Sequence, residues 1–213
     1  MAGRITSIEV QKRNPRRANV YVDGEFVLGL AMIEALKLSK GQVLSDADIE
    51  GLRLVDEKER AHEATLNFLS YRPRNEQEVR RRLQKKDFMP EAVDDAIARL
   101  LRAGLIDDEA FARYWVENRE QHRPRGAYAL RHELRQKGIE SRIVDELVEQ
   151  IDEDANAYLA ATKRLSRWQR LDPSVRRRKM SDYLRRRGFS YDVVLRVWER
   201  LIAEQLIDES DTD

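Results

Sequence analysis

From about residue 57 onward, apolar side chains recur every three or four positions, which is the spacing that places them on one face of an α-helix. Val79 and Leu83, for example, lie four residues apart with three arginines between them. Pro90 suits the first turn of a following helix, and Gly104 suits the residue just past its end. The pattern therefore predicts short amphipathic helices joined by brief turns.

The helical pattern occurs three times. Leu83, Leu134 and Leu184 occupy equivalent positions in the segments LQKKDF, LRQKGI and LRRRGF, and they lie 51 and 50 residues apart. The pattern of each copy predicts three helices. A unit of about 50 residues buries little surface on its own. We therefore expect nine helices in three neighbouring units that pack against one another in an elongated array.

A short sequence motif ends the first and third copies but is missing from the second. It reads GLIDD at 104–108 and QLIDE at 205–209. In the third copy we expect Leu206 and Ile207 to be the buried end of the unit, with Asp208 and Glu209 at its exit.

Helix boundaries follow from local chemistry. Asn75, Asp108 and Ser190 are predicted to cap helix starts, because short polar side chains accept hydrogen bonds from free N–H groups there. Asp87 stands where the other two copies have glycine, at a turn that favours a left-handed residue, so this turn is expected to be strained or differently shaped. A lead-in helix is predicted before each copy, at about 57–71, 108–121 and 154–169.

The first fifty-odd residues have a different, alternating pattern. Asp23-Gly24 between alternating apolar residues is a signal for a two-residue β-hairpin turn. The segment ITSIEVQ (5–11) is a plausible third strand, followed by a short helix near 31–36. Another short helix is expected over 45–54, capped by Ser45 or Asp46.

These patterns predict a mainly all-α fold: tandem three-helix-bundle repeats in an elongated array, with a small N-terminal β-hairpin or meander. The predicted domains are a β-containing segment at 1–56 and helical repeats at 57–105, 106–153 and 154–213, the last with an acidic tail.

Composition excludes several classes of protein. The absence of cysteine rules out disulfides, thiolate catalysis and Cys-based zinc sites. The start of the sequence has no apolar leader, and no apolar run approaches the length of a membrane span. We expect a cytoplasmic protein without a cofactor. Only nine glycines and five prolines agree with long helices.

Charge is balanced in total but clustered along the chain. There are 40 Lys and Arg residues against 39 Asp and Glu residues. The basic residues outnumber the acidic ones by seven to two in 72–86, by five to one in 123–137 and by eleven to two in 163–187. Runs in the same part of each repeat could neutralise phosphates along a nucleic acid or meet an acidic protein groove. The alternative is that they are solvated helix faces balanced by acids elsewhere.

Other chemistry is poorly supported. The acidic pairs Asp107-Asp108 and Glu153-Asp154 could hold a metal or act as a general base, but carboxylates beside helix starts more often cap them. The three histidines lack ligand spacing, and no nucleophile or phosphate-loop motif occurs. Most aromatic residues lie on core stripes; Trp168, flanked by arginines, could instead stack on a base or on an arginine plane.

Three segments together resemble the RecX family of recombination regulators: FLSYRPRNEQEVRRRL (68–83), GLIDDEAFARYWVENR (104–119) and LRHELRQKGI (130–139). The resemblance covers 57 to the C-terminus well, and the N-terminal segment is compatible with it. It implies a non-enzymatic protein that binds the RecA recombinase. We expect a monomer that contacts single-stranded DNA and, more weakly, duplex DNA. Such a protein lodges in the groove of the RecA filament on single-stranded DNA and inhibits its ATPase and strand exchange during DNA repair.

Two alternatives stay open at this point. One is a stand-alone DNA-binding protein built from helix-turn-helix-like units, whose basic second helices enter a groove. The other is a carboxylate-metal nuclease that depends on Asp107 or Asp108.

The residues predicted to contact the filament or nucleic acid are the basic residues of the runs, of which about half can face one way on a helix. They are Arg72, Arg74, Arg80, Arg81, Arg82, Lys85, Lys86, Arg125, Arg131, Arg135, Lys137, Arg176, Arg177, Arg178, Lys179, Arg185, Arg186 and Arg187.

Overall fold

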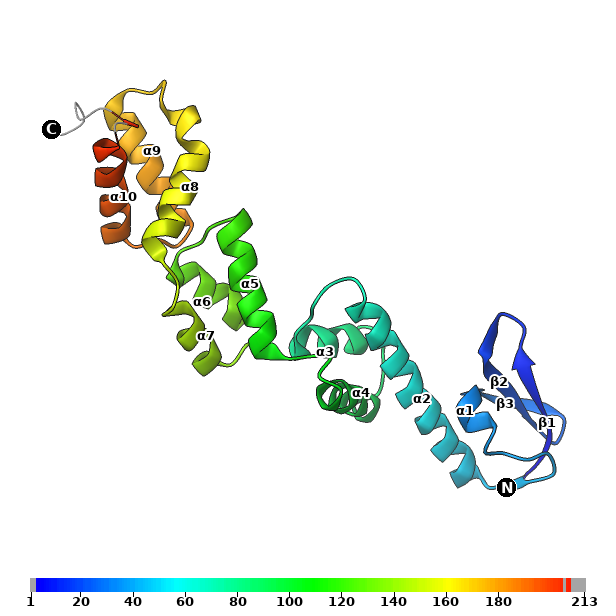
Figure 1. Cartoon of the computed structure of the whole chain (residues 1–213). Coiled ribbons are helices and arrows are strands. Elements are labelled where there is room, and N and C mark those ends of the chain that lie inside the picture. Colours follow the sequence, from blue (N-terminus) through cyan, green and yellow to red (C-terminus); the bar gives the residue numbers. More distant parts are fainter. Residues whose placement is uncertain (1–2, 205, 208–213) are drawn as a thin grey trace. The chain divides into compact units, whose positions relative to one another are not determined.

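The computed structural model describes residues 3–204 and 206–207. The chain divides into two compact units, Met1–Ile106 and Asp107–Asp213 (Figure 1). The first holds four strands, β1 (Gly3–Gln11), β2 (Asn14–Val22), β3 (Glu25–Ala31) and β4 (Val43–Leu44), with helices α1 (Met32–Ala35), α2 (Asp46–Leu69), α3 (Glu76–Gln84) and α4 (Pro90–Arg102). The second holds α5 (Asp108–His122), α6 (Ala127–Gln136), α7 (Ser141–Val148), α8 (Glu153–Trp168), α9 (Pro173–Arg186) and α10 (Tyr191–Ala203).

The N-terminal strands form an antiparallel sheet in the order β3-β2-β1-β4. Asp23 and Gly24 have φ values of 51° and 88°, so the β2–β3 hairpin has the predicted two-residue turn with both residues left-handed. The meander is confirmed. The two-residue strand β4, which pairs with the start of β1, was not predicted because its pattern is too short to register.

Helix α2 corrects one expectation. A single helix of 24 residues replaces the two separate helices predicted over 45–54 and 57–71. No proline interrupts this stretch, and Gly51 keeps a helical φ, so nothing ends the first helix. Ser45, not Asp46, is the N-cap and forms a capping box with Asp48. The predicted domain boundary at 56/57 therefore lies inside a helix.

Asp56 anchors this long helix to the sheet. Its carboxylate accepts a hydrogen bond of 2.8 Å from Arg17 Nη2 and one of 3.1 Å from the backbone N–H of Ala31. The side chain is buried, and a buried carboxylate is tolerable only when charged or N–H donors satisfy it. The pair thus fixes the packing of α2 across the sheet.

Three three-helix repeats follow, as predicted: α2–α4, α5–α7 and α8–α10, each around its own apolar core. Leu83, Leu134 and Leu184 are each 0% exposed, so the sequence repeat marks equivalent core positions. None of the helices in the described part of the chain is long and apolar enough to cross a membrane.

The turn after the second helix of each repeat has one shape. Asp87, Gly138 and Gly188 have φ values of 58°, 83° and 86°, and in each copy the next residue donates a backbone hydrogen bond to the equivalent leucine carbonyl. The expectation of a differently shaped turn at Asp87 is therefore wrong. The strain remains, because a left-handed conformation costs an L-residue about 1–2 kcal/mol.

Helix caps follow the sequence with one change. Asn75 and Ser190 accept the expected N–H groups, but Asp107 rather than Asp108 is the N-cap of α5. Its carboxylate accepts hydrogen bonds of 2.9 and 3.0 Å from two N–H groups of the first turn. Asp108 instead lies within that turn, where its charge favours the positive helix end.

The motif that ends the third repeat is only partly buried. Ile207 is 5% exposed, whereas Leu206 is 38% exposed, so the prediction holds for the isoleucine alone. The first repeat behaves in the same way, with Ile106 buried and Leu105 half exposed. Asp208 and Glu209 lie outside the described residues.

Candidate nucleic-acid interface

In the first repeat, one carboxylate neutralises two of the predicted cations. Arg72 Nη1 lies 2.9 Å from Glu78 Oε2, and Arg74 Nη1 lies 3.7 Å from the same oxygen. The Arg74 guanidinium also lies over the Phe68 ring, 3.9 Å from its centroid. Burial, followed by the charge of Arg72, lowers the pKa of Arg74. These two arginines hold the α2–α3 connection in place.

Arg80 is paired on both sides of its guanidinium. Nη2 lies 3.2 Å from Glu76, and Nη1 lies 2.6 Å from Asp94 on α4. The hydrogen bond to Asp94 is the main cause of the raised pKa of Arg80. The other predicted cations of this repeat are exposed, and within residues 3–204 and 206–207 no carboxylate lies within 4 Å of them: Arg81, Arg82, Lys85 and Lys86.

In the second repeat the predicted cations lie against acidic or aromatic partners. Arg131 Nε and Arg135 Nη2 lie 3.2 and 3.4 Å from Asp145 on α7. Arg125 Nε lies 3.4 Å from Glu133. The Lys137 ammonium lies over the Trp115 ring, at 3.9 Å from the centroid. The predicted cations of this repeat are therefore largely compensated.

The third repeat differs most from the other two in the contacts that its basic side chains make. Arg176 is 8% exposed and donates to the carbonyls of Gln169 and Leu171 at 3.4 and 3.1 Å, so it closes the end of α8. Arg177 lies over the Trp198 ring, 5.9 Å from its centroid. Four further cations of this region are exposed, and no carboxylate of the described residues approaches within 4 Å of them: Arg178, Lys179, Arg185 and Arg186.

The difference has a cause in the repeat itself. The Arg80–Asp94 and Arg131–Asp145 pairs occupy equivalent positions and are each 14 residues apart. The third copy has Ser181 and Leu195 at these two positions, where neither side chain carries a charge. The ion pair that ties the second helix to the third in the other repeats is therefore absent from the α9–α10 contact.

The buried stripe of α9 leaves its cations on the outside. Met180 and Leu184, four residues apart, face the core. Arg178 and Arg185 are seven residues apart, which places them on the same side about 10 Å apart along the helix. One exposed acid, Asp182, lies between them in sequence. This face of α9 can attract an anionic strand more strongly than α6 can.

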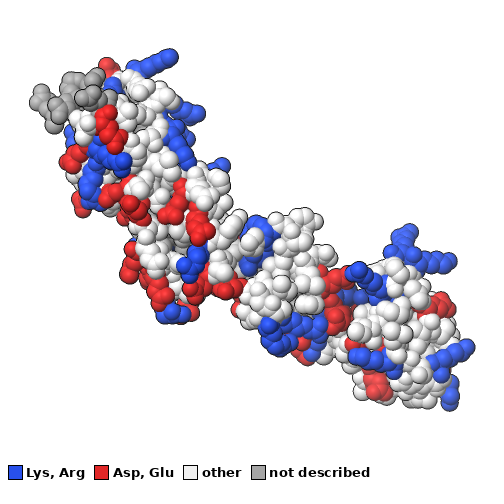
Figure 2. Space-filling model, viewed as in Figure 1, with Lys and Arg blue, Asp and Glu red and all other residues white. Residues whose placement is uncertain are grey.

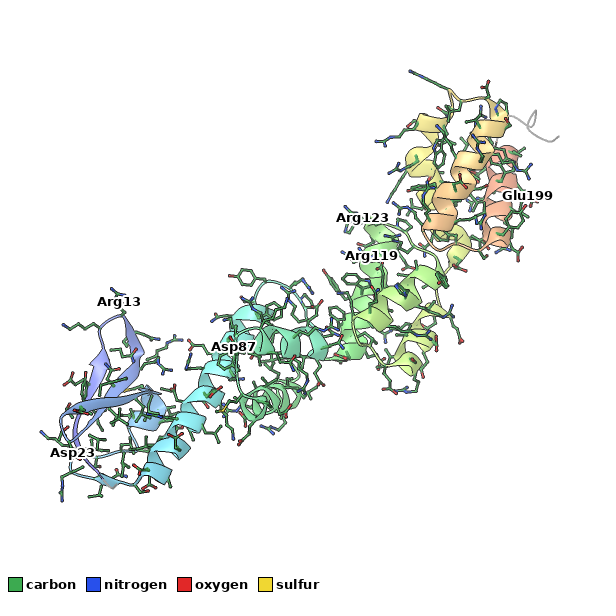
Figure 3. All side chains as sticks on the ribbon, turned by 180° about the vertical axis from the view of Figure 1, so that it is seen from behind. Arg13, Asp23, Asp87, Arg119, Arg123 and Glu199 are labelled. Atoms are coloured by element: carbon green, nitrogen blue, oxygen red, sulfur yellow. The ribbon has the colours of Figure 1, made fainter. Side chains whose placement is uncertain are left out.

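Sequence reasoning missed a second basic feature, at the tip of the β1–β2 hairpin. Lys12, Arg13 and Arg16 are exposed around Asn14-Pro15, and Arg13 is labelled at the hairpin tip in Figure 3. The signal was present as KRNPRR (12–17), but it lay outside the repeats in which basic runs were compared. The tip belongs to the first unit, whereas α9 belongs to the second.

Acidic and basic side chains intermingle over the face seen in Figure 2. Among the described residues, no group of His, Asp or Glu could hold a metal ion. Asp107 and Asp152 cap helices, and Glu153 accepts a hydrogen bond of 2.5 Å from the N–H of Ala127. Trp168 is 7% exposed and packs edge-on against Tyr183, so it is a core residue and is not available for base stacking.

Comparison with known proteins gives a consistent result along the chain. Residues 3–45 match the profile of the regulatory protein RecX N-terminal domain. Residues 61–100, 107–148 and 152–198 match the first, second and third three-helix domains of RecX in that order.

Similar proteins and solved structures carry the same description. "Regulatory protein RecX" of Staphylococcus saprophyticus is 32% identical over 93% of this chain and 74% of its own length. That of Bacillus subtilis is 29% identical over 98% of this chain and 80% of its own. A crystal structure of regulatory protein RecX superposes with a TM-score of 0.73 at 28% identity, covering 92% of this chain and 99% of the other. RecX from Lactobacillus salivarius, 24% identical with a TM-score of 0.62 over 70% of this chain and 99% of its own, shares the fold.

Proposed function

The chain belongs to the RecX family of regulatory proteins, and on that premise we propose that it binds the RecA recombinase and its filament on single-stranded DNA. Binding restrains ATP hydrolysis and strand exchange by RecA and so modulates DNA repair and recombination. The protein does this without catalysis of its own, as a monomer in the cytoplasm. The observation that carries the proposal is the match of four segments of the chain, in order, to the four RecX domain profiles.

The charge distribution supports a filament as the target. A RecA filament on DNA offers phosphates as well as protein surface, so a regulator needs both free cations and neutralised, shape-specific faces. The second repeat supplies the latter, because Asp145 and Glu133 pair with its arginines. The exposed cations of α3 and α9 supply the former.

The rival proposal is a stand-alone DNA-binding protein. The exposed cations on α9, the second helix of a three-helix unit, favour it, since such a helix can enter a groove. Against it, the equivalent helix α6 has its arginines paired to Asp145, so the three units do not form a uniform row of groove-reading helices. Tight, sequence-selective binding to bare duplex would support the rival.

The test is an assay of RecA-catalysed ATP hydrolysis and strand exchange on single-stranded DNA with increasing amounts of this protein. We expect inhibition at amounts well below one molecule per RecA monomer. The double variant R178Q/R185Q should inhibit more weakly, because it removes two exposed charges from α9. No effect of the unmodified protein at any ratio would contradict the proposal.

A matched control separates this face from total charge. The variant R113Q/R142Q removes the same number of charges from exposed arginines of the same unit. Arg113 and Arg142 are already paired at 3.0 Å with Glu109 and Glu146. It should inhibit as the unmodified protein does.

A further inference from the structure

The second and third repeats are joined by a close backbone contact. The N–H of Gly126 donates to the carbonyl of Arg187 at 3.0 Å. A Cβ atom on Gly126 would lie only 2.2 Å from the carbonyl oxygen of Gly188, so glycine is required for this approach. The junction therefore holds the start of α6 against the last turn of α9.

Two guanidinium groups share one tyrosine beside this junction. The Arg187 and Arg164 guanidinium carbons lie 4.7 and 4.8 Å from the centroid of the Tyr183 ring. Trp168 packs edge-on against the same ring, with 5.4 Å between the centroids, and so fixes its orientation. Arg187 Nη1 also donates to the carbonyl of Pro124 at 2.9 Å, which ties it to the second repeat.

A third arginine enters from the second repeat. Arg123 follows the last residue of α5 and is exposed (Figure 3). Desolvation is the main cause of the lowered pKa of Arg187, and the charges of Arg125, Arg164 and Arg123 lower it further. Of these neighbours, Arg125 has a carboxylate partner, Glu133.

The other arginines of this cluster, Arg187 included, have no acidic partner among the described residues. Across the part of the chain that the structure describes, no carboxylate lies within 4 Å of Arg123, Arg164 or Arg187. Like charges gathered without a counter-charge cost free energy, which a bound anion would recover. Guanidinium groups suit an oxyanion in particular, because their planar fork donates paired hydrogen bonds.

We propose that Arg123, Arg164 and Arg187 form a binding site for a phosphate of a single-stranded DNA backbone, at the junction of the second and third repeats. The site deepens the proposed function by assigning a DNA contact to these residues. A phosphate is favoured over a stacked base, because guanidinium groups already lie against the Tyr183 ring and Trp168 is buried beneath it. The two repeats must be docked for the three charges to converge.

The test measures affinity for naked single-stranded DNA without RecA. A labelled thymidine oligonucleotide is titrated with the unmodified protein and with R123Q/R164Q, over a series of salt concentrations, by fluorescence anisotropy. Each phosphate contact to a single strand contributes about 0.7 to the slope of log affinity against log salt, so loss of this one phosphate site should lower the slope by about 0.7 and the affinity roughly fivefold at about 0.1 M salt. Arg187 is left intact because it supports the fold.

The control is again R113Q/R142Q, which removes two charges without touching the junction and should bind like the unmodified protein. Thermal unfolding of both variants by circular dichroism checks that they remain folded, as expected for exposed side chains. An equal affinity for R123Q/R164Q and the control would overturn the proposal. So would an unmodified protein that does not bind single-stranded DNA.

A third result separates DNA from protein as the ligand. If R123Q/R164Q kept its affinity for the oligonucleotide but lost affinity for DNA-free RecA, the cluster would be a site for protein carboxylates, and the phosphate assignment would be wrong. If the unmodified protein failed to inhibit RecA while R123Q/R164Q still lost DNA affinity, only the proposed function would fail.

Discussion

Gly188 offers the sharpest test of how the junction is built. It has a φ of +86°, and a Cβ atom placed on it would lie 2.5 Å from Ala129 Cβ and 2.6 Å from Ala129 N. Gly104 ends the last helix of the first repeat with a φ of +63°, but a Cβ atom there would meet nothing within 4 Å. Both glycines are left-handed, and only one is also crowded.

Substitution by alanine separates the two effects. The left-handed backbone should cost Gly104→Ala about 1–2 kcal/mol of unfolding free energy. Gly188→Ala carries the same cost plus that of forcing a methyl group into a packed contact, about 1–3 kcal/mol, for a total of roughly 2–5 kcal/mol. Because one of the crowded atoms of Ala129 belongs to the backbone, rotation of a side chain cannot relieve the clash.

Urea unfolding measures both variants. All three tryptophans lie in 107–213, so tryptophan fluorescence reports the second unit, which contains Gly188. Circular dichroism follows Gly104→Ala in the first unit. Equal losses in the two variants would show that the close contact of α9 with α6 contributes nothing. Gly188→Ala should also weaken binding to single-stranded DNA, since it separates Arg187 from the second repeat, whereas Gly104→Ala should not.

Three further predictions concern stability. Asp87→Gly should raise the unfolding free energy by about 0.5–1 kcal/mol in urea unfolding, because relief of the left-handed strain exceeds the entropy that glycine adds to the unfolded chain. Leu134→Ala should lower it by about 2–5 kcal/mol, detected by tryptophan fluorescence, because the side chain is fully buried. Hydrogen bonds from Ser45 hold the pKa of Asp48 below its ordinary value of 3.8. A lowered carboxyl pKa stabilises the fold fully above the ordinary pKa, and this stabilisation is lost as the pH falls through the lowered pKa. Ser45→Ala should therefore lower the melting temperature at neutral pH, and its difference from the unmodified protein should shrink as the pH falls below 3.8.

The repeat was predictable because helix geometry dictates it. A core position must recur with the period of the unit, and Leu83, Leu134 and Leu184 do so in sequence and in burial. The turn at Asp87 shows the same constraint acting on the backbone: the packing of helices around one core imposes the left-handed conformation even where the residue disfavours it. The joined helix α2 was missed because helical spacing alone cannot show whether two amphipathic segments are continuous.

The sequence identifies the basic residues, but composition alone cannot separate those paired with carboxylates from those that are not. A count of charges treats Arg80, Arg131 and Arg178 alike, although the first two are held by carboxylates on the next helix. The repeat contained a way to sort part of them, because an arginine and an aspartate recur 14 residues apart in the first two copies, whereas Ser181 and Leu195 replace them in the third.

The junction cluster was beyond even this comparison. Arg123 and Arg187 come from different repeats and converge because Gly126 and Gly188 let two backbones touch. No periodicity within a repeat encodes a contact between repeats. In the sequence, this junction is marked only by two glycines, one before α6 and one after α9. Their shared role in the close backbone contact is apparent only in the docked repeats. With the proposed phosphate site at this junction, the affinity of this protein for DNA depends on that docking as much as on its number of arginines.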